Sequence, residues 1–358
     1  MLEPVPALSS SSSGVRMVTL REVARAAGVS PATASRALTD APHVSAANRE
    51  QVARAAASLG YRPHPAARAL TTGTTATVGL VVPDLANPFF AAVAKGVQAR
   101  ARETGREVLV ADTDEDATLE QDVVARLGNR VDGLVLCSPR MPAETLGSVI
   151  SEALAADGRV ALVNREAPGA PSVSFDIADG VRQAVDHLRA LGHETVAYAG
   201  GPRTSWSDAE RRTALGAAAG GAVLDLGSFR PTHGGGVQAA DLALAAGATA
   251  VLCFNDLVAL GVLARLHARG VRAPDDVSVV GFDDVATAAL VTPALTTVAV
   301  PLARAGREAV DLLGGNAGAA ARHRRLPVEL VVRASTAPAP PAFSPSPPAR
   351  TDPEVVIR

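Results

Sequence analysis

Short apolar runs alternate with helix-forming stretches between residues 76 and 336, and this alternation limits the fold more than any other feature of the sequence. The runs are TVGLVVP, EVLVADT, DGLVLC and RVALVN, then TVAYAG, ATAVLCF and VSVVGF. Between the first four, helices are predicted at about 88–104, 118–128 and 143–156. Continuous apolar strands separated by helices form a parallel sheet covered on both faces. We therefore predict a pair of doubly wound parallel α/β halves.

Open sheets of this kind bind ligands at the carboxyl ends of their strands. Polar and aromatic side chains follow five of the predicted strands, namely Asp84, Asn87, Phe89 and Phe90; Asn164 and Arg165; Trp206, Ser207 and Arg211; Asn255 and Asp256; Asp283 and Asp284. Planar polar groups pair with vicinal hydroxyls, and aromatic rings cover apolar C–H faces. The sequence thus predicts a site for a sugar-sized polyol. Asp256 and Asp284 are interpreted as caps of the helices that follow them.

The charge is distributed unevenly along the chain. Residues 18–73 carry seven arginines against three acidic residues, a net charge of +4, whereas residues 74–358 come to about −6. This asymmetry indicates a small anion-binding module attached to a larger, acidic body.

Three short helices are predicted in the basic module. Thr19 and Glu22 have capping-box spacing, so a first helix runs from about residue 20 to 27. Gly28 provides a tight turn, after which Ser30 caps a second helix with Pro31 in its first position. A third helix follows, from Ser45 to about Leu59, with Gly60 at its end. Two short helices joined by a Gly-containing turn describe a helix-turn-helix.

The second helix, SPATASRAL, is predicted to present a slim polar face. Ala34, Ala37 and Leu38 pack inward, which leaves Thr33, Ser35 and Arg36 for a ligand. Arg36 suits a bidentate contact to guanine, and the two hydroxyls suit phosphates. From composition alone, a solvated three-helix bundle without a ligand remains an open alternative.

A short helix former, PAARAL at residues 65–70, follows the module within the segment 64–75. Six residues are too few for a stable isolated helix, so this segment folds only when something holds it. A flexible linker with an incidental leucine is the alternative.

The runs VTLREVARAAGVSPATASRAL and HVSAANREQVARAAASLGYRPHPAARAL closely resemble the headpiece and hinge of the LacI/GalR (lactose-repressor) family of bacterial transcription regulators. The resemblance implies that Leu70 wedges into the DNA minor groove, with Arg68 beside it. It also implies DNA contacts by Thr19, Ser30, Pro31, Ala32, Thr33, Ser35, Arg36 and His43. Pro31 and Ala32 depart from the polar residues common at their positions, so base choice there depends on apolar contact or on DNA shape.

The segments DLANPFF, ALGHETVAYAGG, FNDLVALGVLARL, DDVSVVGFDD and TPALTTVAVPL resemble the effector domain of the same family, whose fold is that of periplasmic sugar-binding proteins. By position, Phe89, Asn164, Arg211, Asn255 and Asp283 match effector-contacting positions, and Leu302 falls where some members place an aromatic residue. The assignment of Arg211 rather than Arg212 is ambiguous by one residue. Residues 215–236 look shortened and glycine-rich beside relatives.

Several other classes of protein are disfavoured. Cys137 and Cys253 end apolar runs and are interpreted as buried, reduced thiols. The acidic residues of 112–116 are interpreted as a solvated loop rather than a cation site, and neither metal nor cofactor is expected. No apolar run approaches a membrane span, and residues 1–16 lack the pattern of a signal peptide, so a cytoplasmic location is expected.

The predicted organisation is a disordered tail at 1–17, a helix-turn-helix domain at 18–63, a hinge at 64–75, a two-subdomain effector and dimerisation domain at 76–336, and a disordered tail at 337–358. Met17 is an alternative start to Met1. The predicted function is a DNA-binding repressor that binds a pseudo-palindromic operator as a homodimer, with a tetramer left open, under control of a small-molecule effector of the sugar class. The alternatives are a cytoplasmic sugar-binding protein without a DNA role and an enzyme on a Rossmann-like scaffold.

Overall fold

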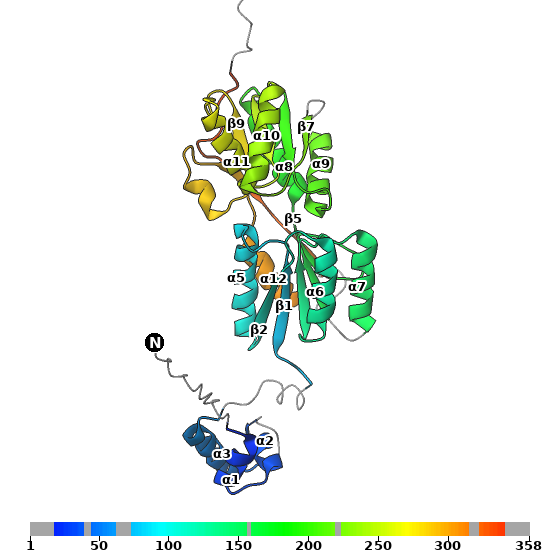
Figure 1. Ribbon diagram of the computed structural model, residues 1–358, viewed down its shortest axis with the longest axis vertical. Coiled ribbons are helices and arrows are strands. Elements are labelled where there is room, and N and C mark those ends of the chain that lie inside the picture. Colours follow the sequence, from blue (N-terminus) through cyan, green and yellow to red (C-terminus); the bar gives the residue numbers. More distant parts are fainter. Residues whose placement is uncertain are drawn as a thin grey trace, which may run out of the picture. The chain divides into compact units, whose positions relative to one another are not determined.

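A computed structural model of the protein describes residues 18–38, 44–61, 73–155, 159–218, 223–314 and 322–340 (Figure 1). The chain divides into two compact units, one that ends at Thr75 and one that begins at Ala76. Both predicted tails, except residues 337–340, lie outside the described residues, as does most of the hinge.

The small unit contains three helices, α1 (Leu20–Ala26), α2 (Pro31–Leu38) and α3 (Ala46–Leu59). The predicted capping box is present, because the Thr19 amide donates to the Glu22 carboxylate at 2.8 Å and the Glu22 amide donates to the Thr19 hydroxyl at 3.4 Å. Gly60 ends α3 in the left-handed conformation, with φ of 64°. The core is built of small side chains, which are Val23, Ala24, Ala27, Ala34, Val52, Ala55 and Ala56.

The first sheet of the large unit has the strand order β11-β5-β4-β3-β1-β2. All its pairings are parallel. Helices α5 and α12 pack on one face, and α6 and α7 on the other (Figure 1). The bounds are β1 (Thr77–Val82), α5 (Pro88–Glu103), β2 (Glu107–Asp112), α6 (Ala117–Gly128), β3 (Gly133–Cys137), α7 (Ala143–Ala155), β4 (Val160–Val163), β5 (Ser172–Phe175), α12 (Leu302–Leu312) and β11 (His323–Leu326).

The second sheet has the order β12-β10-β9-β8-β6-β7, and only β12 runs antiparallel to its neighbour. Helices α8 and α9 pack against each other, and α10 and α11 form a second pair. The bounds are α8 (Ile177–Ala190), β6 (Val196–Gly200), α9 (Trp206–Ala218), β7 (Val223–Ser228), α10 (His233–Ala245), β8 (Ala250–Cys253), α11 (Asp256–Ala268), β9 (Ser278–Asp283), the 3-10 turn η1 (Ala286–Ala289), β10 (Thr296–Ala299) and β12 (Glu329–Val331).

The chain crosses between the sheets three times: from β5 into α8, from β10 into α12, and from β11 into β12. All three crossings leave from the carboxyl ends of strands, namely β5, β10 and β11, so the carboxyl edges of the two sheets face each other. We use the word cleft for this junction between the two carboxyl edges, where the predicted ligand residues are expected. The predicted strands all form. The return of the chain through α12 and β11 to the first sheet was not predicted.

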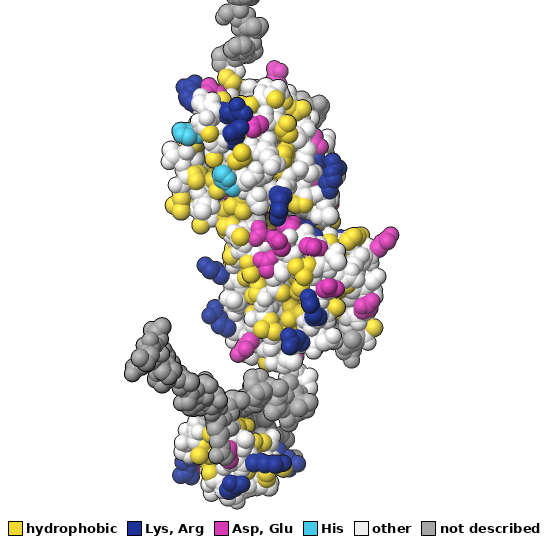
Figure 2. Space-filling model, viewed as in Figure 1, with side chains coloured by type: hydrophobic (Ala, Val, Ile, Leu, Met, Phe, Trp, Pro, Cys, Tyr) yellow, Lys and Arg dark blue, Asp and Glu magenta, His cyan; other side chains and the backbone are white. Residues whose placement is uncertain are grey.

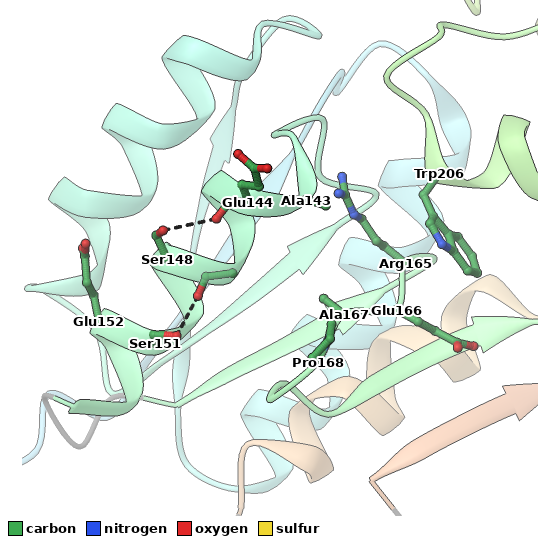
Figure 3. A pocket seen from close by; sticks show the side chains of 11 residues that line it. Ala143, Glu144, Ser148, Ser151, Glu152, Arg165, Glu166, Ala167, Pro168 and Trp206 are labelled. Atoms are coloured by element: carbon green, nitrogen blue, oxygen red, sulfur yellow. Dashed lines mark hydrogen bonds between the residues drawn. The ribbon is translucent and has the colours of Figure 1, made fainter.

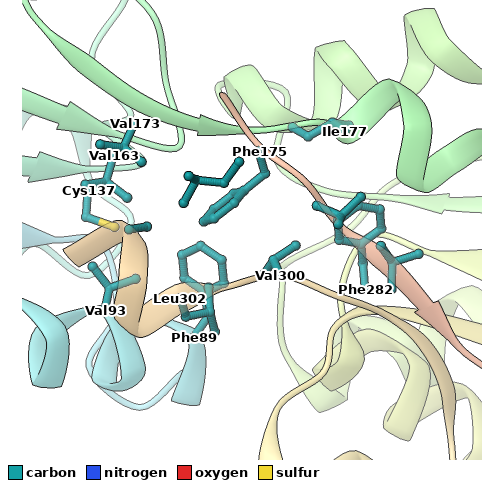
Figure 4. Packing of buried hydrophobic residues seen from close by; sticks show 14 of the residues in the cluster. Phe89, Val93, Cys137, Val163, Val173, Phe175, Ile177, Phe282, Val300 and Leu302 are labelled. Carbon is teal, nitrogen blue, oxygen red and sulfur yellow. The ribbon is translucent and has the colours of Figure 1, made fainter. Parts of the chain in front are cut away.

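A continuous hydrophobic core follows the crossings. Figure 4 shows Phe89 and Phe175 on the side of the first sheet, Phe282 on the side of the second, and Val300 between them. The Phe89 ring packs edge-on against Phe90 and Phe175, with centroids 5.0 and 6.3 Å away. The two halves of the large unit therefore share one core at their junction.

Cys137 and Cys253 are buried and unbridged, as predicted, and burial raises the pKa of both thiols. Within the described residues, no helix combines the length and the apolar character that crossing a bilayer requires.

Candidate functional site

The second helix of the small unit buries one narrow strip and exposes the rest. Ala34 is fully buried, and Ala37 and Leu38 pack partly buried against the same core. Pro31, Ala32 and Arg36 are exposed, and Thr33 and Ser35 are half-buried. This is the orientation predicted from the sequence.

Ser30 fixes the start of α2. Its hydroxyl oxygen accepts a hydrogen bond from the Thr33 amide at 3.0 Å and lies 2.8 Å from the Thr33 hydroxyl. Pro31 has no backbone N–H, so its place in the first turn leaves no amide without an acceptor. The small side chains of Pro31 and Ala32 form the exposed surface of this turn. On the face of the small unit shown in Figure 2, Lys and Arg side chains outnumber acidic ones. The other residues predicted to contact DNA, His43, Arg68 and Leu70, lie outside the described residues.

Four residues at the cleft have backbones in the left-handed region, although none is glycine. Ser138 follows β3 with φ of 49°, Asn164 follows β4 with φ of 55°, and Asp283 and Asp284 at the end of β9 have φ of 112° and 55°. Such conformations cost about 1–3 kcal/mol each and concentrate at functional sites. All four lie at the carboxyl edges of the two sheets, which is where open α/β sheets bind ligands.

On the first sheet, a network of hydrogen bonds fixes the loop after β3. The Asn164 side-chain amide donates to the Ser138 hydroxyl at 2.9 Å. The Arg165 guanidinium donates through Nη1 to the carbonyl oxygens of Pro139 and Met141, both at 2.7 Å. Asn164 and Arg165 are both buried. Ser138, which the sequence analysis did not select, could have been found from its position directly after the apolar run GLVLC.

Three further charged residues, Glu115, Glu120 and Arg140, hold the same loop. The buried Arg140 guanidinium pairs with the Glu115 carboxylate at 2.5 and 2.9 Å, and the Glu120 carboxylate accepts the amides of Arg140 and Met141 at 2.8 Å. The interpretation of residues 112–116 as a purely solvated loop is therefore wrong for Glu115, whose charge is paired. Among the described residues, no cluster of His, Cys, Asp or Glu has the arrangement of a metal site.

On the second sheet, Arg211 lies buried between aromatic rings. Its guanidinium carbon is 3.9 Å from the centroid of the Phe282 ring and 4.8 Å from that of Phe254. Its Nη2 is 3.9 Å from the Asp283 carboxylate, too far for a direct hydrogen bond. The buried Nε has no hydrogen-bond acceptor within the described residues. Arg211 therefore has unused donor capacity beside a buried carboxylate.

Arg211 and Arg212 lie in different surroundings. The Arg212 guanidinium binds the carboxylates of Asp208 and Asp225 and so holds α9 against β7. Arg211 instead lies beside Asp283, and its assignment as the ligand-contacting arginine stays a prediction. Burial raises the pKa of the Asp283 carboxyl well above its usual range, against the opposing charge of Arg211.

The interpretation of Asp256 as the cap of α11 is wrong. Asn255, not Asp256, caps α11 by accepting the Val258 amide at 3.0 Å. The buried Asp256 carboxylate instead accepts the Thr297 hydroxyl at 2.5 Å and the Val285 amide at 2.8 Å. Burial raises the pKa of Asp256 to about 7. Asp284 is likewise no cap, because its carboxylate binds the Arg333 guanidinium at 2.7 Å.

The residues after β1 are mainly structural. Asn87 caps α5 through its side-chain oxygen, which accepts the Phe89 amide at 3.0 Å. Phe89 and Phe90 are 5% and 3% exposed and belong to the shared core. Phe175, Phe254 and Phe282, which also line this junction, were missed because strand residues of this type are indistinguishable from ordinary core in a sequence.

Arg165 and Trp206 lie together in a separate groove of about 950 Å³, which we call the α7 groove (Figure 3). One wall is α7, and the other is the segment after β4. The lining side chains that carry polar groups are Glu144, Ser148, Ser151, Glu152, Arg165, Glu166 and Trp206. Arg211, Asn255 and Asp283 do not line it, so the structure divides the predicted ligand residues between the cleft and this groove.

Comparison with known proteins gives two family matches. Residues 19–64 match the family described as bacterial regulatory proteins, lacI family, and residues 185–336 match a periplasmic binding protein-like domain. The HTH-type transcriptional regulator GalR of Escherichia coli (strain K12) is 36% identical over 309 residues, which cover 83% of this chain and 88% of that protein.

Two solved structures extend the likeness to the whole architecture. The lac repressor dimer bound to operator and the anti-inducer ONPF matches with a TM-score of 0.79 and 30% identity, covering 90% of this chain and all of that chain. The complex of the transcriptional regulator CelR with cellobiose matches with a TM-score of 0.64 and 31% identity, covering 89% of this chain and 99% of that chain. These relatives are transcriptional regulators, so neither the enzyme nor the sugar-binding protein without a DNA role describes this sequence. The chain belongs to the LacI family of bacterial regulatory proteins and is a DNA-binding transcriptional regulator.

Proposed function

We propose that the protein is a homodimeric repressor that binds a pseudo-palindromic operator in the cytoplasm and responds to a sugar held in the cleft. The observation that carries ligand control is the buried Arg211 guanidinium, stacked on Phe282 with unused donors beside Asp283. A buried charge in this state gains most from a polar ligand that accepts its hydrogen bonds. GalR, the lac repressor and the cellobiose complex of CelR support the same class of regulation.

DNA reading is assigned to the exposed side of α2. Arg36 reaches a guanine through two hydrogen bonds, and Ala32 contacts a thymine methyl where other side chains would form hydrogen bonds. Thr33 and Ser35 bind phosphates, as do Thr19, Ser30 and His43 at the edge of the contact. Within this proposal residues 18–63 form the DNA-binding domain and residues 64–75 the hinge, through which Arg68 and Leu70 reach the minor groove.

Effector recognition is assigned to both edges of the cleft. Asn164 and Ser138 supply amide and hydroxyl groups from the first sheet, and Arg211, Asn255 and Asp283 supply charge and amide groups from the second. A ring of hydroxyls satisfies these groups in pairs. Because the ligand contacts both subdomains, its binding changes their relative orientation, a coupling that is worth about 1–3 kcal/mol in regulators of this kind.

Dimerisation is assigned to one side of the large unit. Strand β2 is an edge strand with exposed Leu109 and Val110, and Leu85 precedes α5 beside it. Leu290, just after η1, is 80% exposed. Figure 1 shows α5, β2 and the chain around η1 on the same side of the unit. Large apolar side chains on an open sheet edge need a cover, and a second copy supplies it.

The DNA assignment is tested by selecting duplexes from a random library with the full chain at physiological salt. Arg36→Ala weakens binding to the selected duplex by about tenfold or more and relaxes the guanine preference. The matched control is Arg54→Ala, an exposed arginine of α3 in the same unit. Selection of no sequence by the wild-type protein, or equal losses for the two variants, contradicts the assignment.

The effector assignment is tested by a thermal-shift panel of sugars, since a bound ligand raises the unfolding temperature. Arg211→Met abolishes the shift for the sugar that stabilises the wild type, while binding to the selected duplex persists. Arg203→Met, an exposed arginine ahead of α9, keeps the shift. A shift that survives in Arg211→Met places the ligand elsewhere.

A further inference from the structure

The α7 groove lies immediately outside the cleft. Asn164 binds Ser138 at the cleft edge, and the next residue, Arg165, lines the groove. On the opposite subdomain, Ser205 and Ser207 are buried and 3.0 Å apart through their hydroxyls, while Trp206 between them lines the groove. At both walls, the groove-lining residue is thus a direct sequence neighbour of buried, hydrogen-bonded residues: Arg165 follows Asn164, and Trp206 stands between Ser205 and Ser207.

The Arg165 side chain is fixed by hydrogen bonds that occupy only part of its guanidinium. It is 7% exposed, and only Nη1 is engaged, by the carbonyl oxygens of Pro139 and Met141. Its Nε and Nη2 donate to no acceptor in the described part of the chain, and the side chain rises between the start of α7 and Trp206 in Figure 3. A fixed guanidinium with two donors directed into a groove binds an oxygen-rich ligand at little entropic cost.

The remaining lining favours a neutral, hydroxylated ligand. Glu144 and Glu152 offer carboxylate acceptors from α7, and Trp206 offers a flat indole. Arg165 disfavours a cation, and the two carboxylates disfavour an anion. Glu166 is already committed, because its carboxylate binds the Ser174 hydroxyl at 2.7 Å and Arg325 at 3.1 Å. Donors, acceptors and an aromatic platform together are the chemistry that binds a saccharide ring.

We propose that the α7 groove is a second saccharide subsite, so that the effector has at least two sugar units, one in the cleft and one against Trp206 and Arg165. This inference rests on the proposed function of the cleft. The groove volume of about 950 Å³ is ample for one additional ring, at the upper end of the range of about 300–1,000 Å³ for small-molecule sites.

Trp206 is the single tryptophan of the chain and lines the groove, so the tryptophan fluorescence comes from a residue at this site. The experiment titrates the full-length protein with monosaccharides and with disaccharides that contain them: glucose against cellobiose and maltose, and galactose against lactose and melibiose. At least one disaccharide binds about tenfold more tightly than its monosaccharide and protects Trp206 from acrylamide quenching.

Two variants separate the groove from the cleft. Ser148→Phe fills the groove from the exposed side of α7, and Arg165→Met removes the donors. Each weakens the disaccharide about tenfold and the monosaccharide about twofold or less. Leu154→Phe, on the same helix but outside the lining, changes neither affinity. Because Ser148→Phe leaves the hydrogen bonds of Arg165 intact, it keeps the test valid if Arg165→Met disturbs the loop after β3.

The outcomes distinguish the two proposals. Binding of monosaccharides alone, or disaccharide binding that leaves Trp206 open to acrylamide, overturns the second subsite and leaves the sugar effector standing. Failure of every sugar to bind overturns both.

Discussion

At the scale of single residues, the cleft combines backbone strain with buried charge. Ser138, Asn164 and Asp283 hold left-handed backbones, and the carboxyls of Asp256 and Asp283 are buried within one region. The surrounding fold must supply the free energy that keeps these residues in place. In the proposed function, a polar ligand that bonds to the buried charged groups offsets part of the cost of burying them.

The Asp256 carboxyl makes stability depend on pH. Burial raises its pKa from 3.8 to about 7, so the folded protein holds this proton more tightly than the unfolded chain. Its contribution to stability is complete below about pH 4 and is lost as the pH rises to about 7. We expect Asp256→Asn, which keeps the shape without the charge, to gain in melting temperature relative to wild type between pH 5 and pH 8, measured by Trp206 fluorescence.

Asp241→Asn is the comparison for this prediction. Asp241 is paired with Arg265 and Arg269, and hydrogen bonding lowers the pKa of its carboxyl. Its contribution has the opposite sign, present above the unfolded pKa and lost as the pH falls, so this variant does not gain at high pH. A constant difference between Asp256→Asn and wild type across the pH range contradicts the assignment.

Residue identity in the cleft was only partly predictable. Arg211 and Arg212 are adjacent on a helix and point about 100° apart, so sequence spacing alone could not choose between them. Asn255 and Asp256 are both good caps by type; the distant Thr297 and Val285 decide that Asp256 turns inward. Contacts made across the fold carry this information, and no local pattern contains it.

At the scale of elements, the cap of α2 serves both stability and DNA contact. Ser30→Ala removes the acceptor for the Thr33 amide, which costs about 1 kcal/mol and speeds amide hydrogen exchange in α2. Ser30→Asp keeps the cap and therefore slow exchange, but places a negative charge near the phosphates and weakens binding to the selected duplex. Wild-type affinity in Ser30→Asp shows that this end of α2 does not face DNA.

The close packing of α5 on α12 depends on two glycines, Gly96 and Gly306, at the contact. A methyl group on Gly306 overlaps the backbone carbonyl of Val93, and Gly96 meets Ala303 in the same way. We expect Gly306→Ala to destabilise the large unit by about 1–3 kcal/mol in thermal unfolding. Gly216 lies within α9, and a methyl group added there meets no neighbouring atom. We therefore expect Gly216→Ala to stabilise the large unit by up to about 1 kcal/mol. Equal effects of the two changes contradict this account of the interface.

Elements with strong local signals were predicted well. The seven apolar runs all became strands, and the caps at Thr19, Ser30 and Ser45 set helix starts as expected. Strands β5, β7, β10, β11 and β12 were missed. The last two, HRRL and ELV, have no distinctive pattern and are defined by their partners β5 and β10. These segments become strands because they pair with segments that are distant in the sequence.

At the scale of the whole molecule, the exposed leucines predict how copies associate. We expect Leu290→Arg and Leu109→Arg each to shift the proposed dimer toward monomer in analytical ultracentrifugation, because a buried unpaired charge is costly. Leu154→Arg, an equally large change on α7, leaves the distribution unchanged; Figure 1 shows α7 and α5 on opposite sides of their sheet. A monomeric wild type at micromolar concentration, or equal effects of all three variants, contradicts the proposed interface.

The three crossings between the sheets restrict how this regulator can move. Strands β5 and β11 are neighbours in one sheet and β10 and β12 in the other, so the connecting segments run close together. Bodies tied at one point turn in any direction, whereas bodies tied by three adjacent segments swing about few axes. Different ligands of the proposed site would then drive the protein along one common path and differ only in how far along it they stop, so strong and weak effectors would be grades of a single motion.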